Sequence, residues 1–261
     1  MKLTDKVCIV TGGANGIGKA LCRRIFKEAP RALYVADRDL AGATAVASEL
    51  GGAATPVATD VGRESDIAAL CRRAQEEHGR VDLFFSNAGI AVGGGPEAPD
   101  AEWERAWKVN LMSHVWAARH ALPGMLARGE GYLACTASAA GLLTSLGAAP
   151  YAVTKHGAVA LAEWISITYG ARGIRASCLC PQGVRTDMLT SGMGEAAIQA
   201  VLASGPVLEA EAVAEITVRA LEAEQFLILP HAEVSLYLQR RTQDHERWLK
   251  SMRGVQLKLF S

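Results

Sequence analysis

Short apolar runs alternate with longer stretches of helical periodicity along the first third of the chain. A short apolar run bounded by turn residues is typical of a strand buried on both faces of a parallel sheet. Such runs occupy residues 6–11, 32–36, 53–58 and 81–85. Apolar residues at helical spacing follow the first three runs, around Leu21–Phe26 and over 40–50 and 64–78. This alternation predicts a parallel, doubly wound sheet.

The second half of the chain continues the pattern less regularly. We expect a long or kinked helical segment at 103–126, strands at 132–135 and around Cys178 and Cys180, a long helix from Tyr151, a helix at 195–203 and a last strand at 226–229. A charged helix at 233–252 follows, and residues 255–260 alternate as in a strand. The simplest interpretation of the charged helix is a solvated face. The alternatives are a subunit contact or a cap over a pocket.

Composition limits the class of protein. Half of the 261 residues are hydrophobic, which suits one α/β domain over 1–261 with a large core. Lysine plus arginine and aspartate plus glutamate both number 27, so no basic stripe favours nucleic acid. No apolar run approaches the ~18 residues that span a bilayer, and the first run ends too early for a signal peptide. We expect a soluble, cytoplasmic protein without membrane or nucleic-acid partners.

Six scattered cysteines, at positions 8, 22, 71, 135, 178 and 180, match no metal-binding or redox spacing. The two closest, Cys178 and Cys180, lie two apart in an expected strand. We therefore expect buried, reduced thiols and no metal site.

Tyr151 and Lys155 lie four apart at the start of an expected helix, so their side chains share one face. A nearby ammonium favours the phenolate, and we expect Lys155 to lower the pKa of Tyr151 towards neutrality. Ser138 follows an expected strand and could hold a substrate oxygen over the same cleft. These three side chains suit proton exchange with a carbinol or carbonyl, although a Tyr-x-x-x-Lys pair on a helix is also common by chance.

A glycine turn joins the first expected strand to the first helix, at Thr11–Gly18. Glycines at 12, 16 and 18 let the backbone approach a pyrophosphate, and a helix N-terminus offers free N–H groups to the anion. A plain turn would need only one or two glycines. The sequence therefore predicts a dinucleotide site.

Asp37 ends the second expected strand, nineteen residues after Gly18. A carboxylate there can accept hydrogen bonds from the adenosine ribose hydroxyls and would repel a 2′-phosphate, which favours NAD over NADP. Arg38 follows directly and could accommodate that phosphate. Asp60 could cap the next helix or bind the adenine amine. Asn110, polar in a largely apolar helical segment, either kinks that helix around a water or serves the active site.

Taken together, these motifs resemble the short-chain dehydrogenase/reductase family over nearly the whole chain. The resemblance rests on Thr11–Gly18, Asp37, Asp60-Val61, Asn87–Gly89, Asn110, Ser138, Tyr151-x-x-x-Lys155 and Pro181–Thr186, in the family's order. It implies a single Rossmann-fold α/β domain with a seven-stranded, mostly parallel sheet and helices on both faces. It further implies a substrate lid at about 187–206, and a C-terminal helical extension occupies about 232–261.

The resemblance also implies residue roles. Tyr151 would be the acid/base, Lys155 would lower its pKa and bind the nicotinamide ribose, and Ser138 would position the substrate oxygen. Asn110 would hold a water that links Lys155 to solvent. The implied cofactor-binding set comprises Gly12, Asn15, Gly16, Ile17, Gly18, Asp37, Arg38, Asp60, Val61, Asn87, Ala88, Gly89, Tyr151, Lys155, Pro181, Gly183, Val184 and Thr186.

Three positions depart from the family pattern. Ser86 precedes Asn87 where another asparagine is usual, and Gln182 replaces the usual glycine after Pro181. Gln182 could contact the substrate or tilt into solvent. Pro230-His231 replaces the usual glycine-rich turn after the last strand.

The residues expected at the substrate are mostly apolar: Ser138, Leu142, Ala148, Gln182, Met188 and Met193. They favour a lipophilic alcohol or ketone over a sugar phosphate, although the same apolar residues could pack inward as core. We therefore expect an NAD-dependent oxidoreductase that interconverts a secondary alcohol and a ketone. The rival interpretations are an NADP-dependent carbonyl reductase, a sugar or polyol dehydrogenase, and a non-catalytic nucleotide sensor. A homodimer through the long helices, or a homotetramer, is expected.

Overall fold

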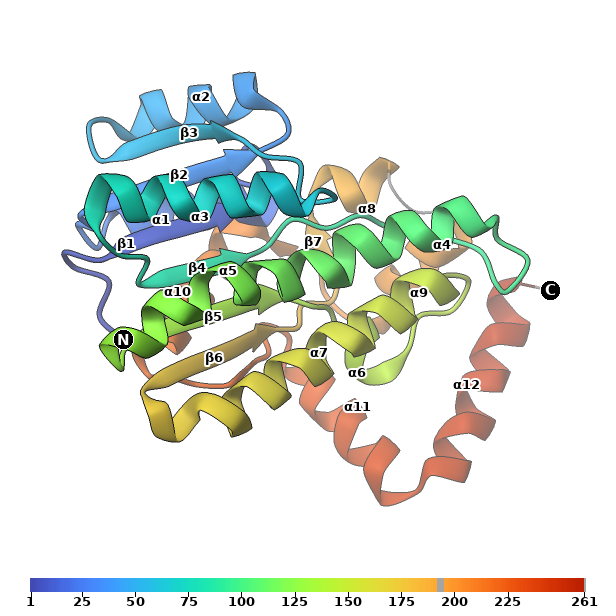
Figure 1. Cartoon of the computed structure of the whole chain (residues 1–261). Coiled ribbons are helices and arrows are strands. Elements are labelled where there is room, and N and C mark those ends of the chain that lie inside the picture. The colour runs from blue at the N-terminus through green and yellow to red at the C-terminus, as the bar shows by residue number, and fades with distance from the viewer. Residues whose placement is uncertain (192–194, 261) are drawn as a thin grey trace.

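A computed structural model describes residues 1–191 and 195–260. Its main sheet has seven strands in the order β3-β2-β1-β4-β5-β6-β9, and every neighbouring pair is parallel (Figure 1). The strands are β1 (Val7–Thr11), β2 (Ala32–Asp37), β3 (Ala54–Ala58), β4 (Leu83–Ser86), β5 (Gly131–Thr136), β6 (Ile174–Leu179) and β9 (Leu227–Ile228). The order reverses between β1 and β4, which places a crevice at the carboxyl ends of these strands.

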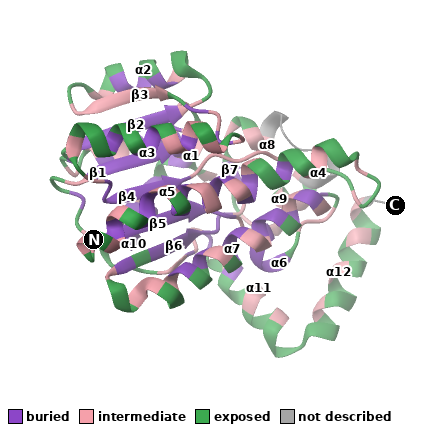
Figure 2. Ribbon diagram, in the orientation of Figure 1, coloured by how far each residue is buried: buried purple, intermediate pink, exposed green. Residues whose placement is uncertain are grey.

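Helices cover both faces of the sheet. On one face lie α1 (Gly16–Phe26), α2 (Leu40–Leu50) and α10 (Ala210–Glu222), and on the other α3 (Glu64–His78), α5 (Ser113–Arg128) and α7 (Ala149–Tyr169). The central strands are buried along their full length, which is why they are continuous apolar runs in the sequence (Figure 2). The doubly wound architecture expected from the sequence is confirmed.

The expected kinked segment consists of three parts. The helix α4 (Asp100–Trp107) runs into a π-helical turn, η1 (Lys108–Met112), and α5 continues from it. A π-turn inserts one extra residue into a helix and often marks a functional site. Asn110 lies at the centre of this turn, so the α-helical repeat is interrupted at the residue for which either a kink or an active-site role was expected.

The smaller elements surround the carboxyl edge of the sheet. They are α6 (Ala140–Leu143), β7 (Val184–Arg185), α8 (Asp187–Ser191), α9 (Glu195–Ser204) and β8 (Leu208–Glu209), whereas η2 (Gly170–Arg172) leads from α7 into the start of β6. The strands β7 and β8 pair in parallel as a separate small sheet. This pairing ties the segment after Pro181 to the segment that precedes α10.

The C-terminal segment differs from the expectation. The helix expected at 233–252 is broken at Asp244 into α11 (Ala232–Gln243) and α12 (His245–Phe260), which form the hairpin in red in Figure 1. The strand-like alternation at 255–260 was misleading, because these residues continue α12. Trp248, Met252 and Val255 are spaced four and three apart, so they form one helical face instead of an alternating strand.

All six cysteines are buried, and none forms a disulfide. Within the described ranges, no helix combines the length and apolarity needed to cross a bilayer.

Candidate active site

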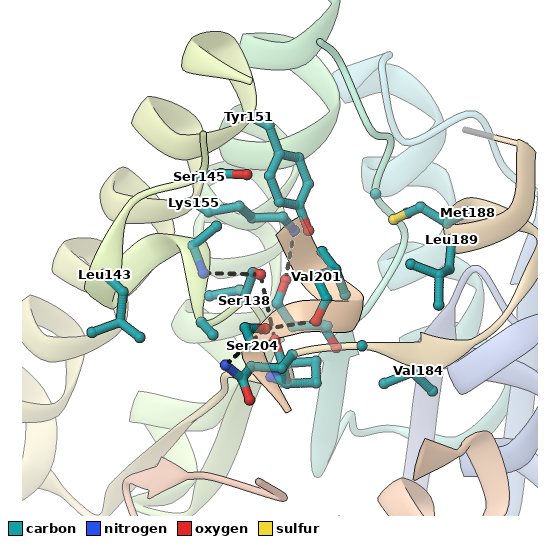
Figure 3. A pocket seen from close by; sticks show the side chains of 18 of the residues that line it. Ser138, Leu143, Ser145, Tyr151, Lys155, Val184, Met188, Leu189, Val201 and Ser204 are labelled. Carbon is teal, nitrogen blue, oxygen red and sulfur yellow. Dashed lines mark hydrogen bonds between the residues drawn. The ribbon is translucent and has the colours of Figure 1, made fainter. Parts of the chain in front are cut away.

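A large cavity of about 1090 Å³ lies at the carboxyl edge of the sheet. Its walls include the glycine turn after β1, the ends of β2, β4 and β5, the start of α7, the loop after β6, and parts of α8, α9, α11 and α12. Such a cavity is the usual ligand site of an open parallel sheet. Figure 3 shows its centre, where Ser138, Tyr151 and Lys155 gather opposite Met188 and Leu189.

The glycine turn has a backbone that other residues would obstruct. Gly12 and Gly16 have φ of +69° and +51°, a conformation that favours glycine. A Cβ on Gly18 would lie 2.0 Å from the carbonyl oxygen of Gly12 and 2.6 Å from Asn87 Nδ2. Asn15 caps α1 by accepting a hydrogen bond of 2.8 Å from the N–H of Gly16. The turn and helix start therefore form a cradle for an anion, and this cradle fits the pyrophosphate of a dinucleotide.

Asp37 stands at the end of β2 on the cavity wall, beside the exposed Arg38. Its Oδ2 accepts from the N–H of Ala14 at 3.1 Å, and its Oδ1 accepts from the N–H of Asp39 at 3.0 Å. These bonds join the carboxylate to the glycine turn and fix its position. Both the acidic residue that favours NAD and the arginine that could favour NADP border the cavity.

Asp60 and Val61 also line the cavity. Asp60 does not cap α3, since the Arg63 N-cap position makes no side-chain hydrogen bond. Instead Asp60 Oδ1 accepts from the N–H of Gly62 at 2.9 Å, which forms a local turn. The expectation that Asp60 caps the next helix is therefore wrong. The expectation that it binds the adenine amine stays a prediction.

Asn87 joins three strands at the edge of the crevice. Its Nδ2 donates to the carbonyl oxygen of Thr11 at 3.0 Å, and its Oδ1 accepts from Thr136 Oγ1 at 2.9 Å. The neighbouring Ala88 and Gly89 line the cavity. A Cβ on Gly89 would lie 3.3 Å from Lys155 Nζ and 3.2 Å from Asn110 Oδ1, so the backbone passes close to both side chains. Asn87 thus fixes the cavity wall by bonds within the protein.

The side chains of Ser138, Tyr151 and Lys155 meet in the cavity as expected. The Ser138 hydroxyl lies close enough to Tyr151 to lower the pKa of its phenol, and Lys155 Nζ lies 5.6 Å from the centre of the Tyr151 ring. Lys155 is 2 % exposed and donates to the carbonyl oxygen of Thr136 at 2.8 Å. The three residues come from the β5 end and from two adjacent turns of α7, and they can hold an oxygen atom and exchange a proton with it.

The pKa of Tyr151 differs from the expectation. Burial raises the pKa of the Tyr151 hydroxyl, and the hydrogen bond with Ser138 opposes this rise only in part. Burial also lowers the pKa of Lys155 to about 8. The expected lowering of the tyrosine pKa by Lys155 is therefore absent, since the ammonium is directed to the Thr136 carbonyl and desolvation of the phenol dominates.

Asn110 uses its side chain to hold a neighbouring loop. Its Oδ1 accepts from the N–H of Ile90 at 2.8 Å, and its Nδ2 donates to the carbonyl oxygen of Ile90 at 3.0 Å. It is fully buried and is not among the described residues that line the cavity. The partners of this side chain are therefore protein groups, and the expected proton relay through Asn110 stays a prediction.

The loop after β6 lines the cavity with Pro181, Gln182, Gly183, Val184 and Thr186. The Gln182 side chain does not tilt into solvent, because its Nε2 donates to Ser204 Oγ at 3.3 Å at the end of α9. Its Oε1 lies 3.1 Å from the position of a Cβ on Gly205. Gln182 therefore packs against the end of α9 on the cavity wall, and its contact with a substrate or cofactor stays a prediction.

The expected substrate residues divide into three groups. Ser138, Gln182 and Met188 line the cavity. The expectation that Leu142 and Ala148 contact the substrate is wrong. They are 8 % and 3 % exposed, and neither is among the described lining residues. Leu142 packs in the core with α7 and α11, and the N–H of Ala148 bonds to Ser145 within its own loop. Met193 lies outside the described residues.

Sequence reasoning missed a large part of the apolar wall. The loop after α6 and the helices α9, α11 and α12 provide this part of the wall: Leu146, Ala200, Val201, Ala203, Tyr237, Trp248, Met252 and Val255. The two C-terminal helices also contribute Arg240, Gln243, Asp244, Arg247 and Ser251. The helical face through Trp248, Met252 and Val255 was the signal that could have identified this wall. The cap alternative for the C-terminal helix is the one this geometry supports.

Comparisons with known proteins agree with this geometry. The family model described as short chain dehydrogenase matches residues 6–196. The chain is 32% identical over 221 residues to (21S)-21-acetoxyl-apo-melianone synthase SDR of Melia azedarach, covering 82% of this chain and 81% of the relative. It is 36% identical over 191 residues to (+)-borneol dehydrogenase 1 of Salvia officinalis, covering 72% and 73%.

A solved structure shares the fold over nearly the full length. The short chain dehydrogenase/reductase from Burkholderia phymatum, determined in complex with NAD, superposes with a TM-score of 0.85 at 28% identity. The match covers 94% of this chain and 96% of that one. With the matching family model, the glycine cradle and the Ser138-Tyr151-Lys155 arrangement, the conclusion is direct: the chain belongs to the short-chain dehydrogenase/reductase family.

Proposed function

We propose that this protein is an NAD-dependent oxidoreductase that interconverts a secondary alcohol and a ketone on an apolar small molecule. The observation that carries the proposal is one continuous cavity that joins the glycine cradle and Asp37 to Ser138, Tyr151 and Lys155. A nicotinamide-dependent alcohol dehydrogenase requires both a site for the cofactor pyrophosphate and a group that transfers a proton. The structural neighbour in complex with NAD supports the choice of cofactor class.

The chain's own residues bind, orient and move a proton. Gly12, Gly16 and the start of α1 would hold the pyrophosphate, and Asp37 would accept hydrogen bonds from the adenosine ribose. Bound nicotinamide supplies the site that gains or loses the hydride. Ser138 Oγ would position the substrate oxygen. The phenolate form of Tyr151 would accept the substrate proton during oxidation, and its phenol form would donate a proton during reduction.

The wall opposite the proton-transfer residues favours an apolar substrate. Met188 and Leu189 border the cavity across from Ser138 and Tyr151, and Leu143 borders it on the side of Ser138 (Figure 3). On this proposal the described part of 187–206 and the hairpin α11–α12 cover the substrate end, as parts of one domain. The relative named (+)-borneol dehydrogenase 1 supports an apolar alcohol as the substrate class.

The test is cofactor-linked turnover on a panel of substrates. Purified protein is assayed with NAD and with NADP against borneol, hydroxysteroids, linear secondary alcohols and polyols, and with the corresponding ketones in reverse. We expect turnover on the apolar alcohols with NAD. Preference for NADP would mean that Arg38 outweighs Asp37, and turnover confined to polyols would reject the apolar assignment.

We also propose a homodimer through α7. Val153, Trp164 and Ile167 are 48%, 54% and 82% exposed, and their spacing places them on one face of that helix. An exposed apolar face of this kind is typical of a contact with another chain. Sedimentation of the wild type and of Ile167→Glu tests this: a dimer that the variant weakens is expected, and a wild-type monomer would reject it.

A further inference from the structure

A buried histidine holds the backbone of the loop that follows β6. His231 is the N-cap residue of α11, and it is 2 % exposed. The main-chain N–H of Gln182 donates to His231 Nδ1 at 3.2 Å, and His231 Nε2 lies 3.1 Å from the carbonyl oxygen of Gly183. Because an N–H must donate and a carbonyl must accept, these partners assign a neutral ring with its proton on Nε2.

The local sequence explains why a side chain is needed at this point. The ladder between β6 and β9 ends where the N–H of Cys180 donates to the carbonyl oxygen of Ile228 at 2.9 Å. Pro181 has no N–H, so Gln182 offers the next main-chain donor. The partner strand β9 has only two residues and is followed closely by Pro230. The imidazole therefore supplies the acceptor that a longer strand would have provided, since a main-chain donor without a partner is costly.

On its other side, the same loop is hydrogen-bonded to Ser138, one of the proton-transfer residues. The carbonyl oxygen of Pro181 accepts from the N–H of Ala139 at 2.9 Å and from Ser138 Oγ at 3.4 Å. The backbone of Pro181–Gly183 is thus held between Ser138 on one side and His231 on the other. Its residues line the cavity. A displacement of this backbone would move both the cavity wall and a hydrogen-bond partner of Ser138.

The same loop is also joined to the elements over the substrate end. Gln182 Nε2 donates to Ser204 Oγ at 3.3 Å, and the hydroxyl of Tyr237 donates to the carbonyl oxygen of Ser204 at 3.2 Å. Figure 3 shows Ser204 beside Val201 at the end of the cavity that Ser138 also borders. Loop, α9 and α11 therefore form one hydrogen-bonded unit around His231.

We propose that His231 is a positioning residue: its neutral imidazole fixes the Pro181–Gly183 backbone in the geometry that receives the nicotinamide end of the cofactor and keeps Ser138 in register with Tyr151. The inference rests on the proposed function for the identity of the ligand. The two ring hydrogen bonds and the burial of the ring carry it.

Protonation of the ring would weaken this arrangement. A proton on Nδ1 would face the N–H of Gln182, so the loop would lose its acceptor. Burial lowers the pKa of His231, while the Gly183 and Pro206 carbonyls and the charge of Glu233, on the first turn of α11, oppose this shift. Gln182, Gly183 and Pro206 present main-chain groups to the ring, so Glu233 is the charged residue that bears on it. Acidic pH therefore releases the loop.

The test uses variants that separate the two ring positions. His231→Phe keeps the ring shape but removes both bonds, whereas His231→Asn retains an acceptor near the Nδ1 position. His245→Asn, at an exposed position at the start of α12, is the matched control. NAD affinity is measured by calorimetry from about pH 5 to about pH 8, the range in which histidine titrates. Imidazole ¹⁵N shifts of the wild type report the tautomer without any turnover.

We expect about tenfold weaker NAD binding for His231→Phe, because both ring hydrogen bonds that hold the loop are lost. His231→Asn should recover part of this loss, and His245→Asn should bind as the wild type does. Binding to the wild type should weaken at acidic pH, and this weakening should be absent from both His231 variants. The ¹⁵N spectrum should show the proton on Nε2.

Two results would overturn the inference. One is a wild-type ring protonated on Nδ1 at neutral pH, which remains decisive even if His231→Phe does not fold. The other is a folded His231→Phe protein with wild-type NAD affinity and the same acid dependence. Neither readout requires a substrate, so failure of the inference is distinguishable from failure of the proposed function, which appears as NAD binding without turnover on any alcohol.

Discussion

Lys155 holds its ammonium group 5.6 Å from the centre of the Tyr151 ring while donating to the Thr136 carbonyl oxygen at 2.8 Å. The ammonium is therefore fixed by the end of β5 rather than by the tyrosine. Burial raises the pKa of Tyr151, so its hydroxyl carries a proton at neutral pH and suits the donation of a proton to a carbonyl oxygen. Oxidation of an alcohol needs the deprotonated form of Tyr151, because the phenolate must accept the alcohol proton.

Alcohol oxidation should therefore accelerate as pH rises. Below the raised pKa of Tyr151, the base form grows about tenfold per pH unit. The rise should level off above about 8, where Lys155 begins to lose its charge. The measurement is kcat/KM for alcohol oxidation as a function of pH, since this ratio reports the pKa values of groups in the free enzyme. A profile that is flat between about pH 6 and about pH 8 would contradict the assignment of Tyr151 as the base.

Replacement of Gly18 by alanine should weaken NAD binding. The new Cβ would lie 2.0 Å from the Gly12 carbonyl oxygen, so the glycine turn must move. Gly170 is the matched control, because a Cβ there meets nothing within 4 Å and its φ is −56°. We expect Gly18→Ala to lose more than about tenfold in NAD affinity and Gly170→Ala to keep it. Equal NAD affinities in the two variants would show that the glycine turn does not bind NAD.

Stability should fall at acidic pH because of His114. This ring is 4 % exposed and bonds through Nδ1 to Ser86 Oγ at 2.7 Å, and burial lowers its pKa from 6.5 to about 3. Between these two values the unfolded chain binds the extra proton, so the stabilisation present above pH 6.5 is lost progressively down to about pH 3. Each pH unit within that window costs up to about 1.4 kcal/mol.

Urea unfolding of the wild type and of His114→Gln at several pH values measures this contribution. The variant lacks the titrating group, so its unfolding free energy should fall less steeply between about pH 6 and about pH 4. Parallel slopes for the two proteins would show that other groups cause the acid sensitivity.

The C-terminal hairpin should affect substrate binding and leave cofactor binding unchanged. Trp248 borders the cavity and its ring centre lies 6.4 Å from that of Tyr237, whereas the adjacent Leu249 is 41% exposed and not among the described lining residues. Trp248→Ala should raise KM for a bulky apolar alcohol about tenfold, since a large buried apolar side chain contributes about 1.5–3 kcal/mol. Leu249→Ala should leave KM unchanged. An unchanged KM in Trp248→Ala would place the substrate elsewhere in the cavity.

The glycine turn, the strands and the proton-transfer residues could be predicted because their signals are local. A buried parallel strand is a continuous apolar run, and Tyr151 and Lys155 share a face because four residues make about one helical turn. The polar Asn110 in an apolar segment suggested either a kink or an active-site role, and the structure has a π-helical turn at this residue. Its actual partner, Ile90, lies twenty residues away and has no sequence signature.

The contacts that join distant segments could not be predicted. Gln182 and His231 are 49 residues apart, and each was noticed only as a departure from a pattern. Their contact depends on β9 ending after two residues, which apolar spacing does not specify. The alternation at 255–260 was misread because six residues fit both a strand and the end of a helix, and only the longer face from Trp248 decides between them.

The most direct test of the central claim is alcohol oxidation by the wild type and by Tyr151→Phe, with NAD affinity measured on the same preparations. Removal of one hydroxyl should leave NAD affinity within about twofold and lower kcat by about 10²–10⁴, the usual contribution of a general base. That result would establish Tyr151 as the group that exchanges the proton. A Tyr151→Phe protein that binds NAD and oxidises the alcohol at the wild-type rate would contradict the account.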